Sequence, residues 1–406
     1  MDADVAAILA PLKEVTAADL QALDRVCETT AASLVAAGVE PPFQVTSADL
    51  AGDPWLICAE RYWGHRLRAL PTIETAARCA RWLGTHATGL TADQRAAISE
   101  SWALRFAYTT RDTVESHHDL TAAVGSIVSQ YAETSPDVCI FAALFHAGVL
   151  RANYWFDELH LFLESSPLTA AAGGQPHRAL FTALRAFAAY GSRRRTVEYA
   201  ANLCTEAWAA SPRSHQVMDV LLHALSVAPP FPGQGEQLRA RAEEAVAAYP
   251  DDHTFRFRLA TGQRRCARYA EAADSLDTAL QLLSAAREWD SPFRPQYLRD
   301  REMTLDLMRQ DTHAAVPRQE TDSWDMDAQR LRRRALDPTA AIRLVGLVAV
   351  LAIAVLVFTG GMADAGQVSL RIRLGQEAAL GGSLLLLALI VNVTTRLVVG
   401  RRGRPF

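Results

Sequence analysis

Apolar residues recur every three or four positions along most of the chain, which is the spacing of helices with one buried face. Alternating runs of β-branched residues, which are typical of strands, do not occur before residue 327. The pattern predicts helices over residues 17–37, 55–70 and 72–83. Thr91 and Gln94 match a capping box and predict the start of a further helix. We therefore expect an all-α fold.

The last part of the chain has a different pattern, with two long apolar segments. Residues 344–362 contain no charged side chain, and residues 378–399 contain only Arg396. As a helix, the first segment would be roughly 28 Å long, which is enough to cross the hydrocarbon core of a bilayer. We expect a transmembrane helical hairpin over residues 341–400.

Arginines flank both apolar segments and predict the orientation of the hairpin. They are Arg330, Arg332, Arg333, Arg334 and Arg343 before the first segment, and Arg396, Arg401, Arg402 and Arg404 at the end of the second or after it. The intervening loop has only Arg371 and Arg373, which are offset by Asp364 and Glu377. The excess of arginine places both flanks, and hence both termini, in the cytoplasm.

The N-terminus has acidic residues and no long apolar run, so it does not resemble a secretory signal. The chain is rich in alanine and arginine, and Lys13 is its only lysine, a usage typical of a high-GC bacterium. The expected location is therefore the inner (cytoplasmic) membrane of a bacterium, crossed twice.

The interior of the hairpin has few polar groups. Asn392, Thr394 and Thr395 can form hydrogen bonds to a neighbouring helix, which would join copies into a homo-oligomer. Two interpretations are open. The hairpin is either a passive anchor or, when several copies assemble, the wall of a pore.

Four expected helices end at breaks that contain proline, namely Ser135-Pro136, Ser166-Pro167, Ser211-Pro212 and Tyr249-Pro250. In the clearest unit, residues 252–283, Tyr269-Ala-Glu-Ala272 precedes Leu276 and Ala279-Leu280, and Ala279 follows Ala245 by 34 positions. This pattern resembles tetratricopeptide-type (TPR) helical repeats. The resemblance covers roughly residues 125–310 and implies a solenoid with an extended concave surface that binds a protein. Gln263 stands where the family usually has tyrosine, so a looser α-solenoid is the alternative.

We divide the chain into an N-terminal helical region (1–124), TPR-like repeats (125–310), a linker with a basic juxtamembrane collar (311–340), the transmembrane hairpin (341–400) and a basic cytoplasmic tail (401–406). The first 326 residues contain 30 basic and 41 acidic side chains, whereas the rest contains eleven arginines and four acids. The part before the membrane is thus acidic, which disfavours nucleic acid as its partner.

No catalytic or nucleotide-binding motif occurs in the sequence, and we expect no cofactor. The best candidates for a metal site are Cys58, His65, Cys79 and His86, because a step of seven residues places each Cys–His pair on one helix face. Structural zinc sites usually have closer spacing, so buried thiols and partly exposed imidazoles are the alternative. An activity of the N-terminal helical region is left open.

Two other groups combine imidazoles with carboxylates. His117-His118-Asp119 falls in an expected polar junction, and we interpret it as a solvated turn. Asp157-Glu158 and His160 share an expected helix near His146, but helical spacing places Glu158 and His160 on different faces.

Aromatic residues are dense in two stretches, at Trp55, Tyr62, Trp63, Trp82 and Trp102, and at Tyr154-Trp155-Phe156. Aromatic residues at this density on helices usually form a core, and the alternative is a groove for a partner helix.

The sequence thus predicts a membrane-tethered helical-repeat scaffold or adaptor that presents a cytoplasmic protein-binding surface. The alternative is a membrane-perturbing effector of a bacterial conflict system, in which the helical region controls the oligomerisation of the hairpin.

Overall fold

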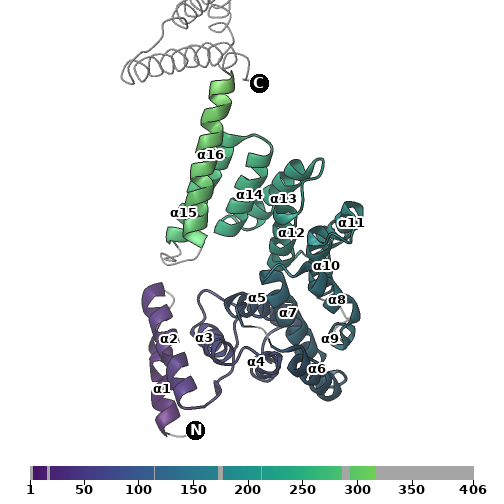
Figure 1. The fold of residues 1–406 in the computed structure, drawn as a ribbon. Coiled ribbons are helices and arrows are strands. Elements are labelled where there is room, and N and C mark those ends of the chain that lie inside the picture. The colour runs from purple at the N-terminus through teal and green to yellow at the C-terminus, as the bar shows by residue number, and fades with distance from the viewer. Residues whose placement is uncertain are drawn as a thin grey trace, which may run out of the picture. The chain divides into compact units, whose positions relative to one another are not determined.

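The computed structural model describes residues 3–15, 19–113, 115–171, 177–211, 213–285 and 293–315. All regular elements in these ranges are α-helices, labelled α1–α16 in Figure 1, which confirms the all-α prediction. The apolar segments predicted to form the hairpin lie outside these ranges. Outside them too lie the arginines of its flanks and its polar residues Asn392, Thr394 and Thr395.

The first nine helices are α1 (Ala3–Glu14), α2 (Leu20–Ala36), α3 (Pro54–Ala69), α4 (Ile73–His86), α5 (Ala92–Thr109), α6 (His117–Tyr131), α7 (Pro136–Ala152), α8 (Phe156–Ser165) and α9 (Pro167–Ala171). The next seven are α10 (Arg178–Gly191), α11 (Val197–Trp208), α12 (His215–Val227), α13 (Gln234–Ala248), α14 (His253–Arg265), α15 (Tyr269–Ala285) and α16 (Phe293–Ala315). None of these helices combines the length and the apolarity that a membrane crossing requires.

Local sequence signals account for several helix starts. The capping box at Thr91 is confirmed, because its hydroxyl accepts from the Gln94 amide and the Gln94 side chain accepts from the Thr91 amide. The helix predicted to start at residue 72 begins at Ile73, where the Thr72 hydroxyl accepts from the Thr75 amide and caps α4. The helix predicted over residues 17–37 was given the wrong start. Helix α2 begins at Leu20, where the Asp19 side chain accepts two backbone hydrogen bonds.

The conformation of the polar residues 117–119 also differs from the prediction. We expected a solvated turn, but His117 begins α6, and Ser116 is its N-cap residue. The Ser116 hydroxyl accepts from the Asp119 amide and donates to the Asp119 carboxylate. A polar first turn with a serine cap satisfies the free amides of a helix, so polarity did not mark a loop here.

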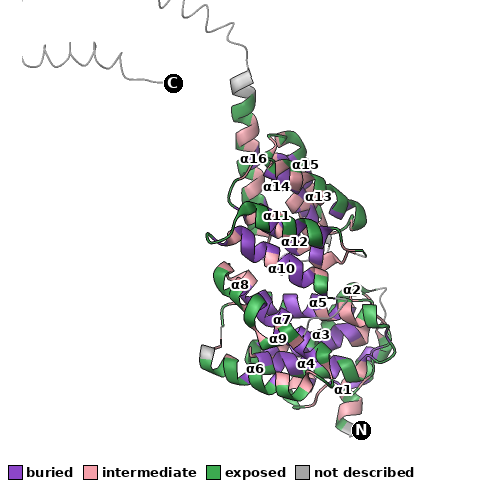
Figure 2. Cartoon of the chain, turned by 90° about the vertical axis from the view of Figure 1, so that its right-hand side faces the viewer, coloured by how far each residue is buried: buried purple, intermediate pink, exposed green. Residues whose placement is uncertain are grey.

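Helix α7 lies at the centre of the hydrophobic core. Every residue from Val138 to Leu150 is buried, as Figure 2 shows in purple. The helix packs against α4, α5, α6, α8, α9 and α10, so apolar side chains cover its whole circumference. The core therefore continues across the boundary predicted at residue 124, because α4 and α5 precede that boundary and α7 follows it.

The dense aromatic residues of the first stretch belong to this core. Tyr62, Trp63, Trp82 and Trp102 are almost completely buried, whereas Tyr154 and Trp155 of the second stretch are exposed. The indole N–H of Trp82 donates to the carbonyl of Pro41 at 2.8 Å, which fixes the loop before α3 to α4. The groove interpretation is therefore wrong for these four residues.

The second half contains successive helix pairs, α10/α11, α12/α13 and α14/α15. Helix α10 packs against α12, and α12 packs against α14. Helix α14 separates two apolar clusters, since Phe255 and Leu259 belong to the main core while Phe257 and Ala260 belong to a smaller cluster with Tyr297 of α16. Gln263 is buried and accepts from the Ser275 hydroxyl of α15 at 2.8 Å.

Gly262 allows α13 and α14 to approach closely. A Cβ atom at this position would lie 2.6 Å from the backbone nitrogen of Arg239 on α13. Because the conflict is with backbone atoms, no rotation of a side chain relieves it. Close helix contact at this point therefore requires a residue without a side chain.

Gly262→Ala should destabilise the fold by about 1–3 kcal/mol, because α13 and α14 must move apart. The matched control is Gly84→Ala in α4, where a Cβ atom meets nothing within 4 Å. This control should raise the free energy of unfolding by up to about 1 kcal/mol, the difference in helix propensity. Urea unfolding followed by circular dichroism measures both. Equal effects of the two substitutions would contradict the close approach.

Candidate functional site

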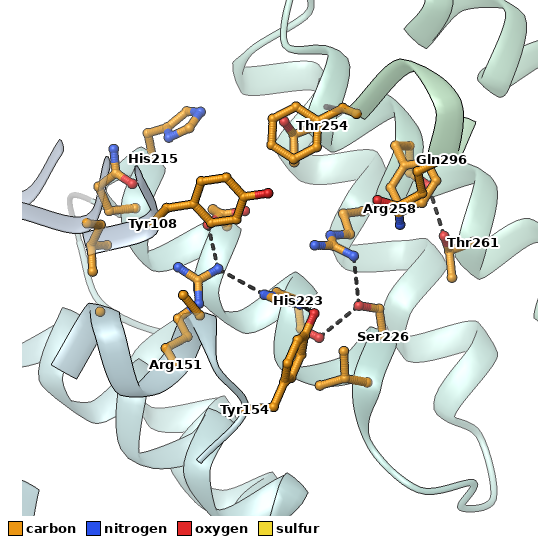
Figure 3. Close-up of a pocket in the computed structure, with 18 of the residues that line it drawn as sticks. Tyr108, Arg151, Tyr154, His215, His223, Ser226, Thr254, Arg258, Thr261 and Gln296 are labelled. Atoms are coloured by element: carbon orange, nitrogen blue, oxygen red, sulfur yellow. Dashed lines mark hydrogen bonds and ion pairs between the residues drawn. The ribbon is translucent and has the colours of Figure 1, made fainter. Parts of the chain in front are cut away.

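A cavity of about 570 Å³ lies within the helical region. It is lined by residues of α5, α7, α12, α14 and α16 and by the turn after α7 (Figure 3). Its charged lining residues are Arg105, Arg151, Arg258, Arg264, Arg265, Asp219 and Asp300, together with His215 and His223. Arginine thus outnumbers the acids around a concave surface, which is the opposite of the acidic composition of this part of the chain.

Arg151, in the last turn of α7, joins that helix to α12. Its Nη2 lies 2.8 Å from the Asp219 carboxylate and 3.1 Å from Nδ1 of His223. Asp219 and His223 are four positions apart on α12, so they lie on the same face of that helix. The charges of Arg151 and Arg258 outweigh the effect of burial and hold the pKa of Asp219 below its usual value.

His223 is neutral in this arrangement. A guanidinium nitrogen only donates, so Nδ1 must accept and the ring proton must be on Nε2. Nε2 lies 3.3 Å from the hydroxyl of Tyr154, to which it can donate. Burial and the charges of Arg258 and Arg151 keep the pKa of His223 well below its usual value, which agrees with this tautomer.

Arg258 of α14 faces the same space from the other side (Figure 3). Its Nη1 donates to the Ser226 hydroxyl at 2.9 Å. Among the described residues no carboxylate lies within ion-pair distance of Arg258, and its Nε has no hydrogen-bond partner. Burial lowers its pKa, which shows that the charge is poorly solvated. Asp219 is therefore the nearest balancing charge for two arginines.

The remaining charged residues have partners that fix the walls of the cavity. Arg264 lies 3.7 Å from Asp300 of α16. Arg265 donates to the carbonyls of Leu225 and Ser226, the last turn of α12. These contacts hold α14 against α12 on one side and α16 on the other, and they satisfy carbonyls that a helix end leaves free.

His215 and Arg105 pair with acids that do not line the cavity. His215 at the start of α12 bonds to Asp252, the N-cap residue of α14. Burial opposes protonation, but the hydrogen bond and charge of Asp252 outweigh it and raise the pKa of His215. Arg105 forms an ion pair with Glu60 of α3.

Tyr154 has an unusual backbone conformation. Its φ angle is +57°, in the left-handed region that a bulky residue rarely adopts. The Trp155 amide donates to the Leu150 carbonyl and the Tyr154 amide to the Arg151 carbonyl, which together form a Schellman motif at the end of α7. Glycine is usual at this position, and tyrosine costs about 1–2 kcal/mol there. The strained residue is the one whose phenol reaches His223.

Aromatic rings form part of the cavity wall. The ring of Tyr108 on α5 stacks on Phe293 of α16, with centroids 5.9 Å apart and planes 24° apart. Phe257 lies nearby on α14 and is stacked on Tyr297. The exposed fractions of Tyr108 and Tyr154 are 37% and 49%, so both rings keep surface that a ligand can contact.

The four residues proposed for a metal site each have separate surroundings. His65 lies 2.8 Å from Glu28, and His86 stacks on Trp82 with ring centroids 4.9 Å apart. Cys58 and Cys79 are buried thiols whose pKa values are raised by burial. In the described ranges, no three His, Cys, Asp or Glu side chains form a group that could hold a metal ion. The sequence was a poor guide because equal spacing along two helices does not make their faces meet.

The other acid–base candidates also have separate partners. Asp157 accepts from the Ser192 hydroxyl at 2.6 Å, and His160 contacts Arg195. His146 is buried in α7 against the ring of Phe162, and burial lowers its pKa to about 4. None of these residues lines the cavity.

Sequence reasoning did not single out the central residues of the cavity, Arg151, Asp219, His223 and Arg258. Two signals were present. Arg151 directly follows the uncharged run 138–150, and Asp219 and His223 are the polar residues, four apart, of an otherwise apolar segment. Such polar positions next to buried helix faces are candidates for a shared site.

In the described ranges, Tyr154 and Ala267 are the residues other than glycine at left-handed helix ends, and replacing them should separate strain from packing. Ala267 follows α14 with a φ angle of +58° and is exposed. Ala267→Gly should therefore raise the free energy of unfolding by about 1 kcal/mol. Tyr154→Gly should gain less than this, because it also removes ring contacts with Phe187 and His223. Urea unfolding tests both, and a loss of stability in Ala267→Gly would contradict the assignment of strain.

Comparison with models of protein families, with curated proteins and with solved structures finds no match for this chain. The cavity combines excess arginine, one neutral histidine and aromatic walls, which is an arrangement suited to binding an anion.

Proposed function

We propose that the chain is a membrane-tethered helical-repeat adaptor whose helical region binds an anionic ligand in the arginine-lined cavity. The observation that carries the proposal is the pair Arg151 and Arg258, which share Asp219 as their nearest balancing charge. A buried cation without its own counter-ion is costly, and a bound anion removes that cost.

The form of the cavity supports binding. Its arginines come from α5, α7 and α14, and α12 contributes Asp219 and both histidines. Ion pairs and hydrogen bonds between these helices hold the donors in place before a ligand arrives, as for Arg151 with Asp219 and Arg265 with α12. Preformed donors lose little conformational entropy on binding, so the affinity for an anion is correspondingly higher.

Two further elements of the proposal rest on the sequence. The apolar segments 344–362 and 378–399 support a membrane hairpin with both termini in the cytoplasm. The TPR-like pattern in residues 125–310 supports a surface that recruits a protein, and the pairing of α12/α13 and α14/α15 agrees with such an arrangement.

Sulfate should stabilise the protein more than chloride at equal ionic strength, because a dianion balances Arg151 and Arg258 better than a monoanion. Arg258→Met should reduce the difference, whereas Arg81→Met on the exposed face of α4 should leave it intact. The general stabilising effect of sulfate on folded proteins is common to all three proteins, so only the part that Arg258→Met removes belongs to the cavity. Thermal unfolding at several salt concentrations measures the shift. An identical sulfate effect in all three proteins would contradict anion binding.

Deletion of residues 341–400 should move the protein from the membrane fraction to the soluble fraction on centrifugation of a cell lysate. An apolar hairpin of this length inserts essentially irreversibly, so alkaline carbonate should not extract the full chain. Extraction of the full chain by carbonate would contradict the membrane tether and would leave the anion site unaffected.

A further inference from the structure

We propose that the ligand of the cavity is a small phosphomonoester, with its phosphate between Arg151 and Arg258 and an aromatic or apolar remainder against Tyr108 and Tyr154. This inference rests on the proposed anion binding and names the class of anion. It is carried by the charge, the free donors, the volume and the aromatic walls of the cavity.

The charge of the cavity matches a dianion. Arg105 and His215 are balanced by Glu60 and Asp252, which lie outside the lining. The other charged lining residues are Arg151, Arg258, Arg264, Arg265, Asp219 and Asp300, and four arginines against two aspartates leave two positive charges. A phosphomonoester carries about −1.5 to −2 charges at neutral pH, whereas a carboxylate carries only one.

The two central arginines have donors to spare. Arg151 uses Nη2 for Asp219 and His223, and Arg258 uses Nη1 for Ser226. In the described part of the chain, the other terminal nitrogens, Nη1 of Arg151 and Nη2 of Arg258, form no protein hydrogen bond, and neither is sealed from solvent. Figure 3 shows both guanidinium groups pointing into the cavity from opposite walls. Three acceptor oxygens of a phosphate suit such convergent guanidinium donors.

Size favours a small molecule. A cavity of about 570 Å³ is within the range of sites that enclose one cofactor-sized or metabolite-sized ligand. The side of the cavity next to Arg151 is bounded by the exposed rings of Tyr108 and Tyr154. An aromatic or apolar group attached to the phosphate can bury surface against these rings, which inorganic phosphate cannot do.

The position of Tyr154 in the cavity wall is fixed by contacts of its backbone and its hydroxyl. The Schellman motif sets its backbone, and the hydrogen bond with neutral His223 sets its hydroxyl. His223 in turn is oriented by Arg151, which faces the proposed phosphate position. The strained residue Tyr154 is thus connected through His223 to Arg151, the residue that would bind the anion. Strained residues persist at functional sites of this kind.

Isothermal titration calorimetry of the full-length protein with phenyl phosphate, inorganic phosphate and benzoate tests the proposal. Phenyl phosphate should bind at least about tenfold more tightly than either of the others, because only it combines the dianion with a ring. Arg258→Met should lose phenyl phosphate binding without a fall in the unfolding temperature, since the substitution removes a partly buried charge that has no carboxylate of the described residues within ion-pair distance. Arg81→Met should bind as the unchanged protein does.

A second variant keeps the test valid if Arg258→Met does not fold. Tyr108→Leu should weaken the binding of phenyl phosphate severalfold and leave inorganic phosphate unchanged, because it removes the ring contact alone. Benzoate binding as tight as that of phenyl phosphate would overturn the phosphomonoester assignment. If sulfate stabilises the protein through Arg258 but phenyl phosphate does not bind, only this inference fails. If the sulfate effect is also missing, the proposed anion site fails as well.

Discussion

The burial of residues 138–150 of α7 is the constraint on which the rest of the helical region depends. A helix that is apolar on all sides must be covered on all sides, and six other helices supply that cover. Each large side chain buried in this way contributes roughly 1.5–3 kcal/mol. The small residue Gly148 lets α5 approach, since a Cβ atom there would lie 2.6 Å from the Cβ of Ala107. Six helices thus surround the buried part of α7.

The same constraint positions the cavity. The buried run of α7 ends at Leu150, and Arg151 and Tyr154 follow it directly at the end of the helix. Arg151 then joins α7 to α12 through Asp219 and His223. The Asp252–His215 contact and the bonds of Arg265 join α12 to α14. The buried run of α7 and the charged contacts at its C-terminal end therefore place polar side chains of α7, α12 and α14 around the cavity.

The electrostatics of this space are out of balance for a purely structural site. An ion pair that only stabilised the fold would need one arginine for Asp219, yet Arg258 is also desolvated nearby. Tyrosine at the left-handed position after α7 is likewise less stable than glycine. Unbalanced charge and backbone strain both lower the stability of the unliganded protein, so folding alone does not favour them, and such features cluster at functional sites.

Much of the secondary structure followed from the sequence, because caps and breaks act over a few residues. Thr91 with Gln94 and the proline breaks at Ser135 and Tyr249 fell at helix boundaries, as local hydrogen bonding and the fixed φ of proline dictate. The start of α6 was missed because a polar cap and a polar loop look alike in one sequence. The TPR-like character of the second half and the membrane hairpin stay predictions.

By itself, the sequence determined that the described part of the chain is helical and where several of its helices begin, because these are consequences of local periodicity and capping. It also determined the apolar segments near the C-terminus and the arginines beside them. Only the tertiary structure decided which polar residues meet. Arg151 and Arg258 are separated by more than a hundred positions in the sequence, and their approach depends on how α7, α12 and α14 pack. The charge of a cavity depends on which side chains lie close together in space, and a sequence pattern does not give these distances.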